Sequence, residues 1–337
     1  DLLIHRTYTD PMLKTWLSEA EHEDLSDLER ASVREMQRHW RRANRLPARL
    51  VEAMTRATLR CEHAWRTQRG ANDWNGFLEN FRDVVRLARE EAKCLTVNDC
   101  CYDGLLEKYE PGITSAEIAC FFTEMKAWLP SLIKKVRARQ EEEERVIVPQ
   151  GPFAVAQQQA LGHAIMQRLG FDFAAGRLDV SAHPFCGGVA EDVRLTTRYR
   201  EDDFIQGLMA IIHETGHALY EQNRPREWIT LPIGHARSMG IHESQSLLFE
   251  MQMGRDPHFL DYIAPLIQQH LGKDRAFDVA NLVKLYHRVK PGFIRVEADE
   301  LRYAAHVILR FEIERDLIEG NIEADDIPAL WDEKMQA

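Results

Sequence analysis

Apolar residues recur with the period of an α-helix along most of this chain. After a capping-box pattern at Ser26, the residues Leu28, Val33, Met36 and Trp40 recur at helical spacing between charged residues. Similar spacing predicts helices over residues 26–43, 47–68, 72–95, 116–144, 153–169, 241–253, 258–271, 276–289, 294–318 and 326–335. A further apolar-periodic helix is predicted between the capping pair Asp202-Asp203 and a stop at Asn223.

One segment has a residue pattern that is not helical. Residues 176–189 and 192–199 carry β-branched side chains, period-two alternation and Gly/Pro punctuation, which predict one short β-sheet or hairpin near 178–199. Elsewhere we find no internal repeat, low-complexity tract or domain-scale linker. The pattern therefore predicts a mainly α fold, with a single large helical domain over residues 1–337.

Charge and cysteine usage narrow the possible partners. The 43 basic and 54 acidic residues give a net charge of −11, which argues against a nucleic-acid partner. No apolar run approaches the ~18–20 residues that span a membrane, and the first residues lack the pattern of a signal peptide. None of the six cysteines forms a Cys-x-x-Cys pair, so we expect reduced thiols and a cytoplasmic location.

The helix that begins after Asp203 contains the strongest chemical signal. Residues 213–217 read His-Glu-Thr-Gly-His. His213 and His217 are four positions apart, so on a helix they share one face and could bind one Zn²⁺. Glu214 lies beside them, where it could reach a metal-bound water. This pattern is typical of zinc-dependent peptidases, although two unrelated histidines could have the same spacing by coincidence.

A catalytic zinc site needs a third protein ligand. Glu243, in the segment Gly240-Ile-His-Glu-Ser-Gln245, is the best candidate, on a helix that a glycine-bounded turn could fold back toward the zinc helix. His242 competes for the role but points about 100° away on a helix. Glu243 could also be an ordinary carboxylate at a helix start.

This donor set predicts a hydrolytic mechanism. Zinc would lower the pKa of a bound water and polarise the substrate carbonyl. Glu214 would take the proton of the attacking water and pass it to the leaving amine. Zn²⁺ is the expected cofactor, and Co²⁺ or Mn²⁺ fits the same ligands.

Five motifs in order resemble those of the carboxypeptidase Taq family of zinc carboxypeptidases. They are His183-Pro-Phe185, Asp192-Val-Arg-Leu-Thr196, His213–His217, His242-Glu-Ser-Gln245 and Ile294-Arg-Val-Glu-Ala-Asp299. The resemblance covers essentially the whole chain. It implies a helical fold around a deep central groove, usually a homodimer, that releases single C-terminal residues from peptides with broad specificity. The expected partners are peptides with a free C-terminus, and neither nucleic acid nor a membrane.

The resemblance also suggests substrate-binding residues. Arg295 is the candidate for gripping the terminal carboxylate, because a guanidinium can bind that group with two hydrogen bonds. Its structural alternative is an ion pair with Glu297 or Asp299. His183 and Arg194 could line the groove, but His183 could instead brace the hairpin and Arg194 could pair with Asp192.

The chain departs from the family pattern at its ends. A family motif resembling Gly-x-x-Gln-Asp-x-His-Trp is not found before Ala337, and the N-terminal helices look short. We therefore expect a metallocarboxypeptidase-like catalytic domain that lacks the family's N-terminal and C-terminal ends. Two alternatives remain open at this point. One is an inactive or truncated metal-binding helical scaffold, and the other is a zinc endopeptidase or aminopeptidase with the same ligands.

Overall fold

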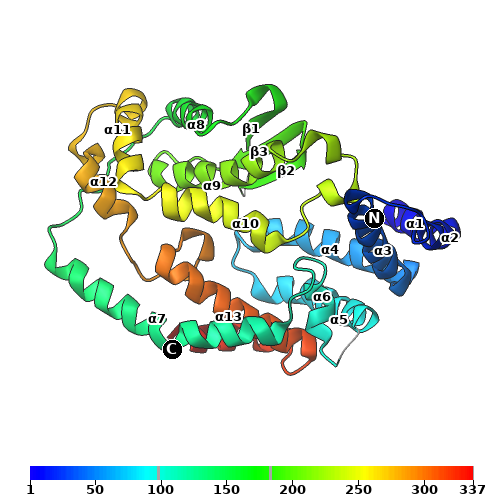
Figure 1. Ribbon diagram of the computed structural model, residues 1–337. Coiled ribbons are helices and arrows are strands. Elements are labelled where there is room, and N and C mark those ends of the chain that lie inside the picture. The colour runs from blue at the N-terminus through cyan, green and yellow to red at the C-terminus, as the bar shows by residue number, and fades with distance from the viewer. Residues whose placement is uncertain (97–98, 182–183, 337) are drawn as a thin grey trace. The chain divides into compact units, whose positions relative to one another are not determined.

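The computed structural model describes residues 1–96, 99–181 and 184–336. These residues form a mainly helical structure with one small sheet, which confirms the predicted fold class (Figure 1). The helices are α1 (Leu2–Tyr8), α2 (Pro11–Ala20), α3 (Asp27–Arg45), α4 (Ala48–Gln68), α5 (Trp74–Leu95), α6 (Cys101–Leu106), α7 (Ser115–Glu142), α8 (Val155–Leu169), α9 (Phe204–Gln222), α10 (Met239–Leu247), α11 (Pro257–Leu271), α12 (Val279–Tyr286), α13 (Glu300–Glu319) and α14 (Ile327–Gln336). The strands are β1 (Gly176–Val180), β2 (Phe185–Val189) and β3 (Asp192–Thr197).

Three predicted helices differ from the structure near the candidate site. The helix predicted over 294–318 begins only at Glu300, because Asp299 caps it by accepting a hydrogen bond from the Arg302 amide. Residues Arg295–Glu297 form a separate 3₁₀ turn, η6. The helix predicted over 276–289 is shorter, and the one predicted from 241 begins at Met239 and changes at Leu248 into a π-helical segment, η4 (Leu248–Met253).

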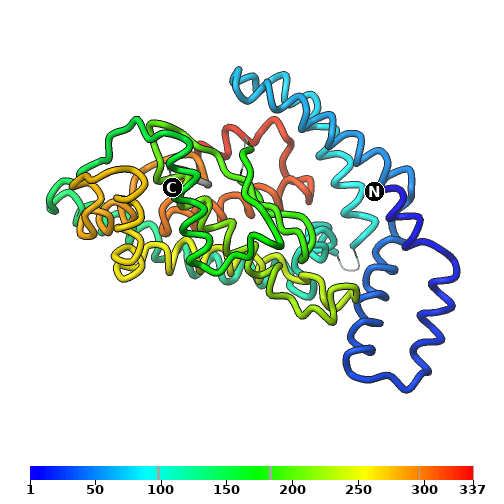
Figure 2. The backbone as a smooth tube through the Cα atoms, turned by 90° about the horizontal axis from the view of Figure 1, so that it is seen from above, coloured from blue at the N-terminus to red at the C-terminus, as the bar shows by residue number. Residues whose placement is uncertain are grey.

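The chain divides into two compact units. The first contains residues 1–127, 231–237 and 306–337. Its helices share several small apolar clusters, such as Leu78 and Val85 of α5 with Leu317 and Ala324. Figure 2 shows α2 and α3 as an antiparallel pair in dark blue.

The sequence predicts one catalytic domain around a central groove. This interpretation stays a prediction.

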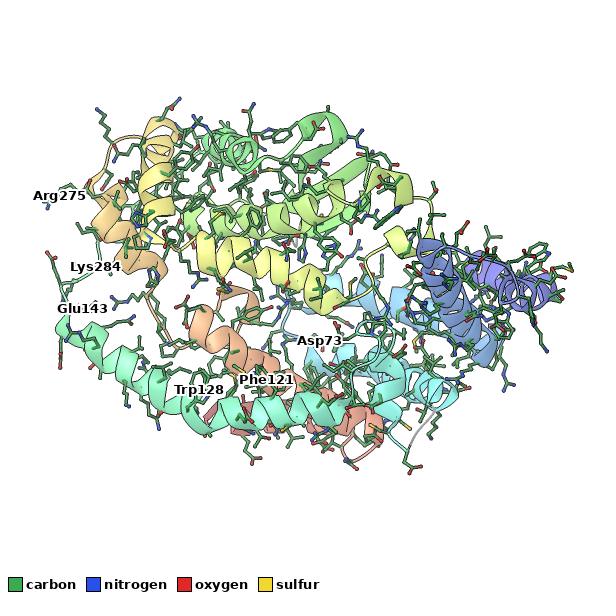
Figure 3. All side chains as sticks on the ribbon, viewed as in Figure 1. Asp73, Phe121, Trp128, Glu143, Arg275 and Lys284 are labelled. Carbon is green, nitrogen blue, oxygen red and sulfur yellow. The ribbon has the colours of Figure 1, made fainter. Side chains whose placement is uncertain are left out.

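The second unit contains residues 128–230 and 238–305, and its largest core surrounds α9. In Figure 1, α9 lies between α8 above it and α10 below it. The core joins side chains of α8, α9, α11 and α12, among them Leu161, Ile165, Phe204, Leu208, Ile212, Leu260, Ile263, Ile267 and Leu282. At its edge, Lys284 of α12 pairs with Glu144, close to Glu143 in Figure 3. Burial of this many apolar side chains fixes the position of α9.

The small sheet covers another face of α9. Its order is β1-β3-β2, with β3 parallel to β1 and antiparallel to β2. Leu195 in the central strand lies opposite Leu178 and Cys186, and it packs with Val193 against Ile211 of α9. The predicted sheet near 178–199 is therefore confirmed, with three strands among the described residues.

Helices α9 and α10 approach each other closely at Gly216. A Cβ atom at this position would lie 2.7 Å from the carbonyl oxygen of Gln245 and 2.7 Å from the Cα atom of Ser246. Only glycine permits this approach without a shift of one backbone. The contact brings Glu243, just before Gln245, close to the face that carries His213 and His217.

Two further expectations concern the described residues. Their helices are too short or too polar to cross a membrane. All six cysteines are free thiols, as expected from their spacing.

Candidate metal centre

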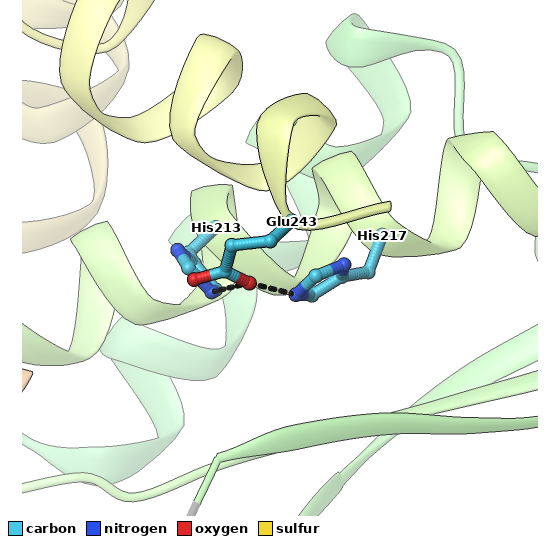
Figure 4. A group of neighbouring side chains, drawn as sticks. All are labelled: His213, His217 and Glu243. Carbon is cyan, nitrogen blue, oxygen red and sulfur yellow. Dashed lines mark ion pairs between the residues drawn. The ribbon is translucent and has the colours of Figure 1, made fainter. Parts of the chain in front are cut away.

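The three predicted metal ligands converge on one point. Glu243 Oε2 lies 3.1 Å from His217 Nε2 and 3.8 Å from His213 Nε2 (Figure 4). One donor atom from each residue lies within 4.8 Å of the other two. Two imidazoles and a carboxylate at this separation fit a divalent metal of the zinc type, with one position left for water or substrate. His242, the competing ligand, points its nitrogens elsewhere.

Electrostatics favour the charged form of the carboxylate ligand. Burial alone would raise the pKa of Glu243, but hydrogen bonds from His217 and Tyr303 and the nearby His213 outweigh it and lower the pKa to about 2. Glu243 is therefore ionised at neutral pH, which is the form that binds a cation.

Glu214 has the opposite environment. It is buried on α9, and this burial raises its pKa, although the neighbouring histidines partly oppose the shift. Cys186 on β2 is affected by the charge of this carboxylate. Burial raises the pKa of its thiol to about 12, and the negative charges of Glu214 and Glu221 raise it further. A buried carboxylate of raised pKa is suited to accept a proton.

His213 is held by a partly buried carboxylate, Glu250, which was not among the predicted site residues. Its Nδ1 atom lies 2.9 Å from Glu250 Oε2, and Arg255 donates to Glu250 Oε1 over 3.3 Å. Arg255 is buried. Burial lowers the pKa of His213, but Glu250 outweighs this and raises it. A carboxylate that fixes the second nitrogen of a ligand histidine is a common support of metal sites.

His217 is held through a second imidazole. Its Nδ1 atom lies 2.7 Å from His242 Nδ1, and His242 Nε2 lies 2.9 Å from Glu221 Oε1. Arg224 pairs with Glu221 at 2.9 Å. A signal for Glu221 was present, since it follows His217 by four residues on the same helical face. Glu250 follows Glu243 by two turns, which is a weaker signal.

Arg295 is connected to the centre by a tyrosine. Arg295 Nη1 donates to the Tyr303 hydroxyl over 2.9 Å, and this hydroxyl donates to Glu243 Oε1 over 2.9 Å. Burial and the charge of Glu243 raise the pKa of Tyr303 to about 12, so Tyr303 stays a neutral donor. The suggested ion pair with Asp299 is taken instead by Arg302, whose Nε lies 2.5 Å from that carboxylate.

Arg194, the second predicted substrate-binding residue, makes no contact with the centre among the described residues and takes its structural alternative. It lies on β3, is half-exposed and pairs with Asp192 at 2.6 Å. His183 lies outside the described residues. A role for either residue in substrate binding stays a prediction.

The fold and the donor set together define a metal-dependent hydrolase of the two-histidine, one-glutamate type. Comparison with known families is more specific. The family model described as carboxypeptidase Taq (M32) metallopeptidase matches residues 1–337. The chain therefore belongs to this family of metallocarboxypeptidases, which confirms the resemblance found in its motifs.

Individual relatives agree with the family assignment. The chain is 35% identical to thermostable carboxypeptidase 1 of Thermus thermophilus, over 98% of this chain and 68% of that protein. It is 33% identical to carboxypeptidase 1 of Bacillus subtilis, over 93% of this chain and 63% of that protein. The chain thus spans about two thirds of the length of these relatives.

Solved structures show the same fold. Metallocarboxypeptidase 1 of Trypanosoma cruzi matches with a TM-score of 0.92 and 46% identity, over 98% of this chain and 68% of that one. The carboxypeptidase of Deinococcus radiodurans matches with a TM-score of 0.87 and 28% identity, over 98% of this chain and 67% of that one. The predicted enzyme class, a metallocarboxypeptidase hydrolase, is confirmed at the level of the family.

Proposed function

We propose that this chain is a zinc-dependent carboxypeptidase that releases single residues from peptides with a free C-terminus. The observation that carries the proposal is the hydrogen-bonded line from Arg295 through Tyr303 to Glu243. It couples a guanidinium, which suits a substrate carboxylate, to the convergent donors of His213, His217 and Glu243. An aminopeptidase would need an acidic group in the place of Arg295.

Each residue has a distinct part in the proposed reaction. Zinc, when held by His213, His217 and Glu243, supplies Lewis acidity toward the scissile carbonyl and the attacking water. Arg295 binds the terminal carboxylate and so limits cleavage to the last peptide bond. Glu214 accepts a proton from the attacking water and delivers it to the leaving amine.

The metal, the compartment and the assembly complete the proposal. Zn²⁺ is chosen because two imidazoles and a carboxylate suit it, and Co²⁺ or Mn²⁺ fits the same donors. The free thiols agree with a reducing compartment such as the cytoplasm. A homodimer and broad side-chain specificity come from the family resemblance alone.

Substitution of Glu214 tests the mechanism directly. Glu214→Gln keeps the shape of the side chain but removes the proton acceptor. We expect kcat on an N-terminally blocked peptide to fall about 10²–10⁴-fold, the usual effect of losing a general base. The measurement compares the wild type and the variant at equal zinc occupancy. Equal turnover would favour a metal-binding scaffold without catalytic function.

The choice of peptide separates a carboxypeptidase from other zinc peptidases. One peptide is blocked at its N-terminus and the other is amidated at its C-terminus. The proposal requires cleavage of the first and release of its last residue, because Arg295 would have a carboxylate to bind. Cleavage of the amidated peptide alone would exclude a carboxypeptidase.

A further inference from the structure

His217 and His242 form an unusually direct contact between two rings. Their Nδ1 atoms are 2.7 Å apart, and the rings stack with centroids 4.7 Å apart. His242 also lies against Tyr220, and its second nitrogen, Nε2, lies 2.9 Å from Glu221 Oε1. Both nitrogens of His242 therefore have partners, and all these side chains are largely buried.

The protons in this chain of bonds can be assigned by elimination. One Nδ1 atom must donate a proton and the other must accept it. If His242 Nδ1 donated, His217 would carry its own proton on Nε2, and that nitrogen could not bind a metal. If His217 Nδ1 donates, its Nε2 lone pair is free for a metal, which would replace the proton now shared between Nε2 and Glu243 Oε2 over 3.1 Å. His242 must then accept at Nδ1 and donate from Nε2–H to the Glu221 carboxylate, which accepts readily.

We propose that His242 and Glu221 are positioning residues that hold His217 in the tautomer required for metal binding. The proposal rests on the metal site proposed above and names two of its supporting residues. In this arrangement His242 supports a ligand and is not itself one. His242 of α10 thereby links the Glu221 carboxylate to His217 by two hydrogen bonds, and both of these partners lie on α9.

The other ligand histidine shows why an intermediate ring is used. Glu250 of η4 contacts His213 directly at 2.9 Å. Glu221 instead lies on α9 itself, one turn beyond His217, and reaches it only through His242 of α10. His242 neighbours Glu243 in the sequence, so the same helix that supplies the third ligand also orients the second. The two arms are independent and can be tested separately.

Three variants of the full chain test the proposal. His242→Phe keeps a ring for stacking but removes both nitrogens, whereas His242→Gln keeps one acceptor and one donor. His258→Phe makes the same change at an exposed histidine in the first turn of α11 and serves as the control. The measured quantity is the zinc dissociation constant, obtained by competition with a chelator of known affinity.

We expect His242→Phe to weaken zinc binding about 10–100-fold, the usual cost of losing such a support. His242→Gln should restore most of the affinity, and His258→Phe should bind like the wild type. Zinc binding by His242→Phe equal to that of the wild type would overturn the proposal. So would an affinity of His242→Gln as low as that of His242→Phe, because the donor and acceptor that Gln restores would then give His217 no support.

A second measurement needs no variant. In ¹⁵N NMR spectra of the zinc-loaded wild type, His242 should be the Nε2–H tautomer and His217 should carry its proton on Nδ1. A proton on His242 Nδ1 would overturn the proposal even if zinc is bound. Failure of the wild type to bind zinc at all would overturn the metal site itself, which distinguishes the two ideas.

Discussion

Helices α3 and α9 have the same length and similar starts but opposite surroundings. Each has 19 residues, and each begins at a side-chain cap, Ser26 for α3 and Asp203 for α9. Ten residues of α9 are buried, whereas in α3 only Ser32 is. The difference shows that capping defines where a helix begins, while packing decides how firmly its side chains are held in space.

The two helices are held by different forces. Helix α9 contacts the core of α8 and α11 on one side and the sheet on another, so apolar burial orients it. Helix α3 is attached largely by polar contacts, such as the hydrogen bonds from Arg237 to Glu35 and from Arg45 to the Leu95 carbonyl. His213 and His217, whose donor atoms must lie within a few ångströms of each other, therefore stand on α9, the helix that apolar burial orients.

A core truncation should have the largest effect on stability. Ile212 of α9 is fully buried, so Ile212→Ala should lower the free energy of unfolding by about 2–5 kcal/mol. The comparable change in α3, Val33→Ala, removes a half-buried side chain and should cost less than about 1.5 kcal/mol. Denaturant unfolding of both variants measures the difference. Similar losses would show that α3 is packed as tightly as α9.

A smaller but more local effect is expected at the contact of α9 with α10. Gly216→Ala places a methyl group 2.7 Å from two backbone atoms of α10 and should cost about 1–3 kcal/mol. Because α10 carries Glu243, zinc affinity should fall as well. Gly70→Ala is the control, since a Cβ atom there meets only ordinary contact at 3.6 Å. Unchanged zinc affinity in Gly216→Ala would mean that α10 shifts without moving Glu243.

The smallest effect is expected from the polar attachment of α3. Burial alone would raise the pKa of Glu35, but the hydrogen bonds from Arg38 and Arg237 outweigh it and lower the pKa. A lowered pKa stabilises the fold above the unfolded-state pKa, and this contribution is lost as pH falls through the folded-state pKa. Glu35→Gln should therefore cost about 0.5–1 kcal/mol at neutral pH and progressively less in acid.

Unfolding curves at several pH values measure this dependence. Glu19→Gln, which removes an exposed carboxylate on α2, controls for the change in net charge. A cost of Glu35→Gln that does not change with pH would contradict the assignment of its stabilising role to the ionised carboxylate.

The sequence predicts α9 better than it predicts the parts of the structure near it. Periodic apolar residues and the Asp203 cap are local signals, and the helix that they predict is confirmed. The paired histidines and Glu243, which stands in a recognisable motif, lie together as expected, and their role as metal ligands stays a prediction. The start of α13 was predicted wrongly, since Arg295 continues the helical pattern and only the bond from Arg302 to Asp299 shows where the helix begins.

The supports of the metal centre could not be predicted in the same way. Rotation about its own helix alone predicts that His242 points away from the donors of Glu243. Its contact with His217 depends on the approach of α10 to α9 at Gly216, which is a tertiary feature. Likewise, Glu250 reaches His213 from a π-helical segment, and sequence periodicity does not predict that geometry.

The continuous segment formed by α10 and η4 has a mechanical consequence. It carries Glu243, which reaches the metal side of the histidines, and Glu250, which reaches the far side of His213. Because both carboxylates stand on one continuous segment, a change that displaces its backbone along α9 acts on Glu243 and Glu250 together. Such a change would alter the proposed metal ligand and the support of His213 at the same time.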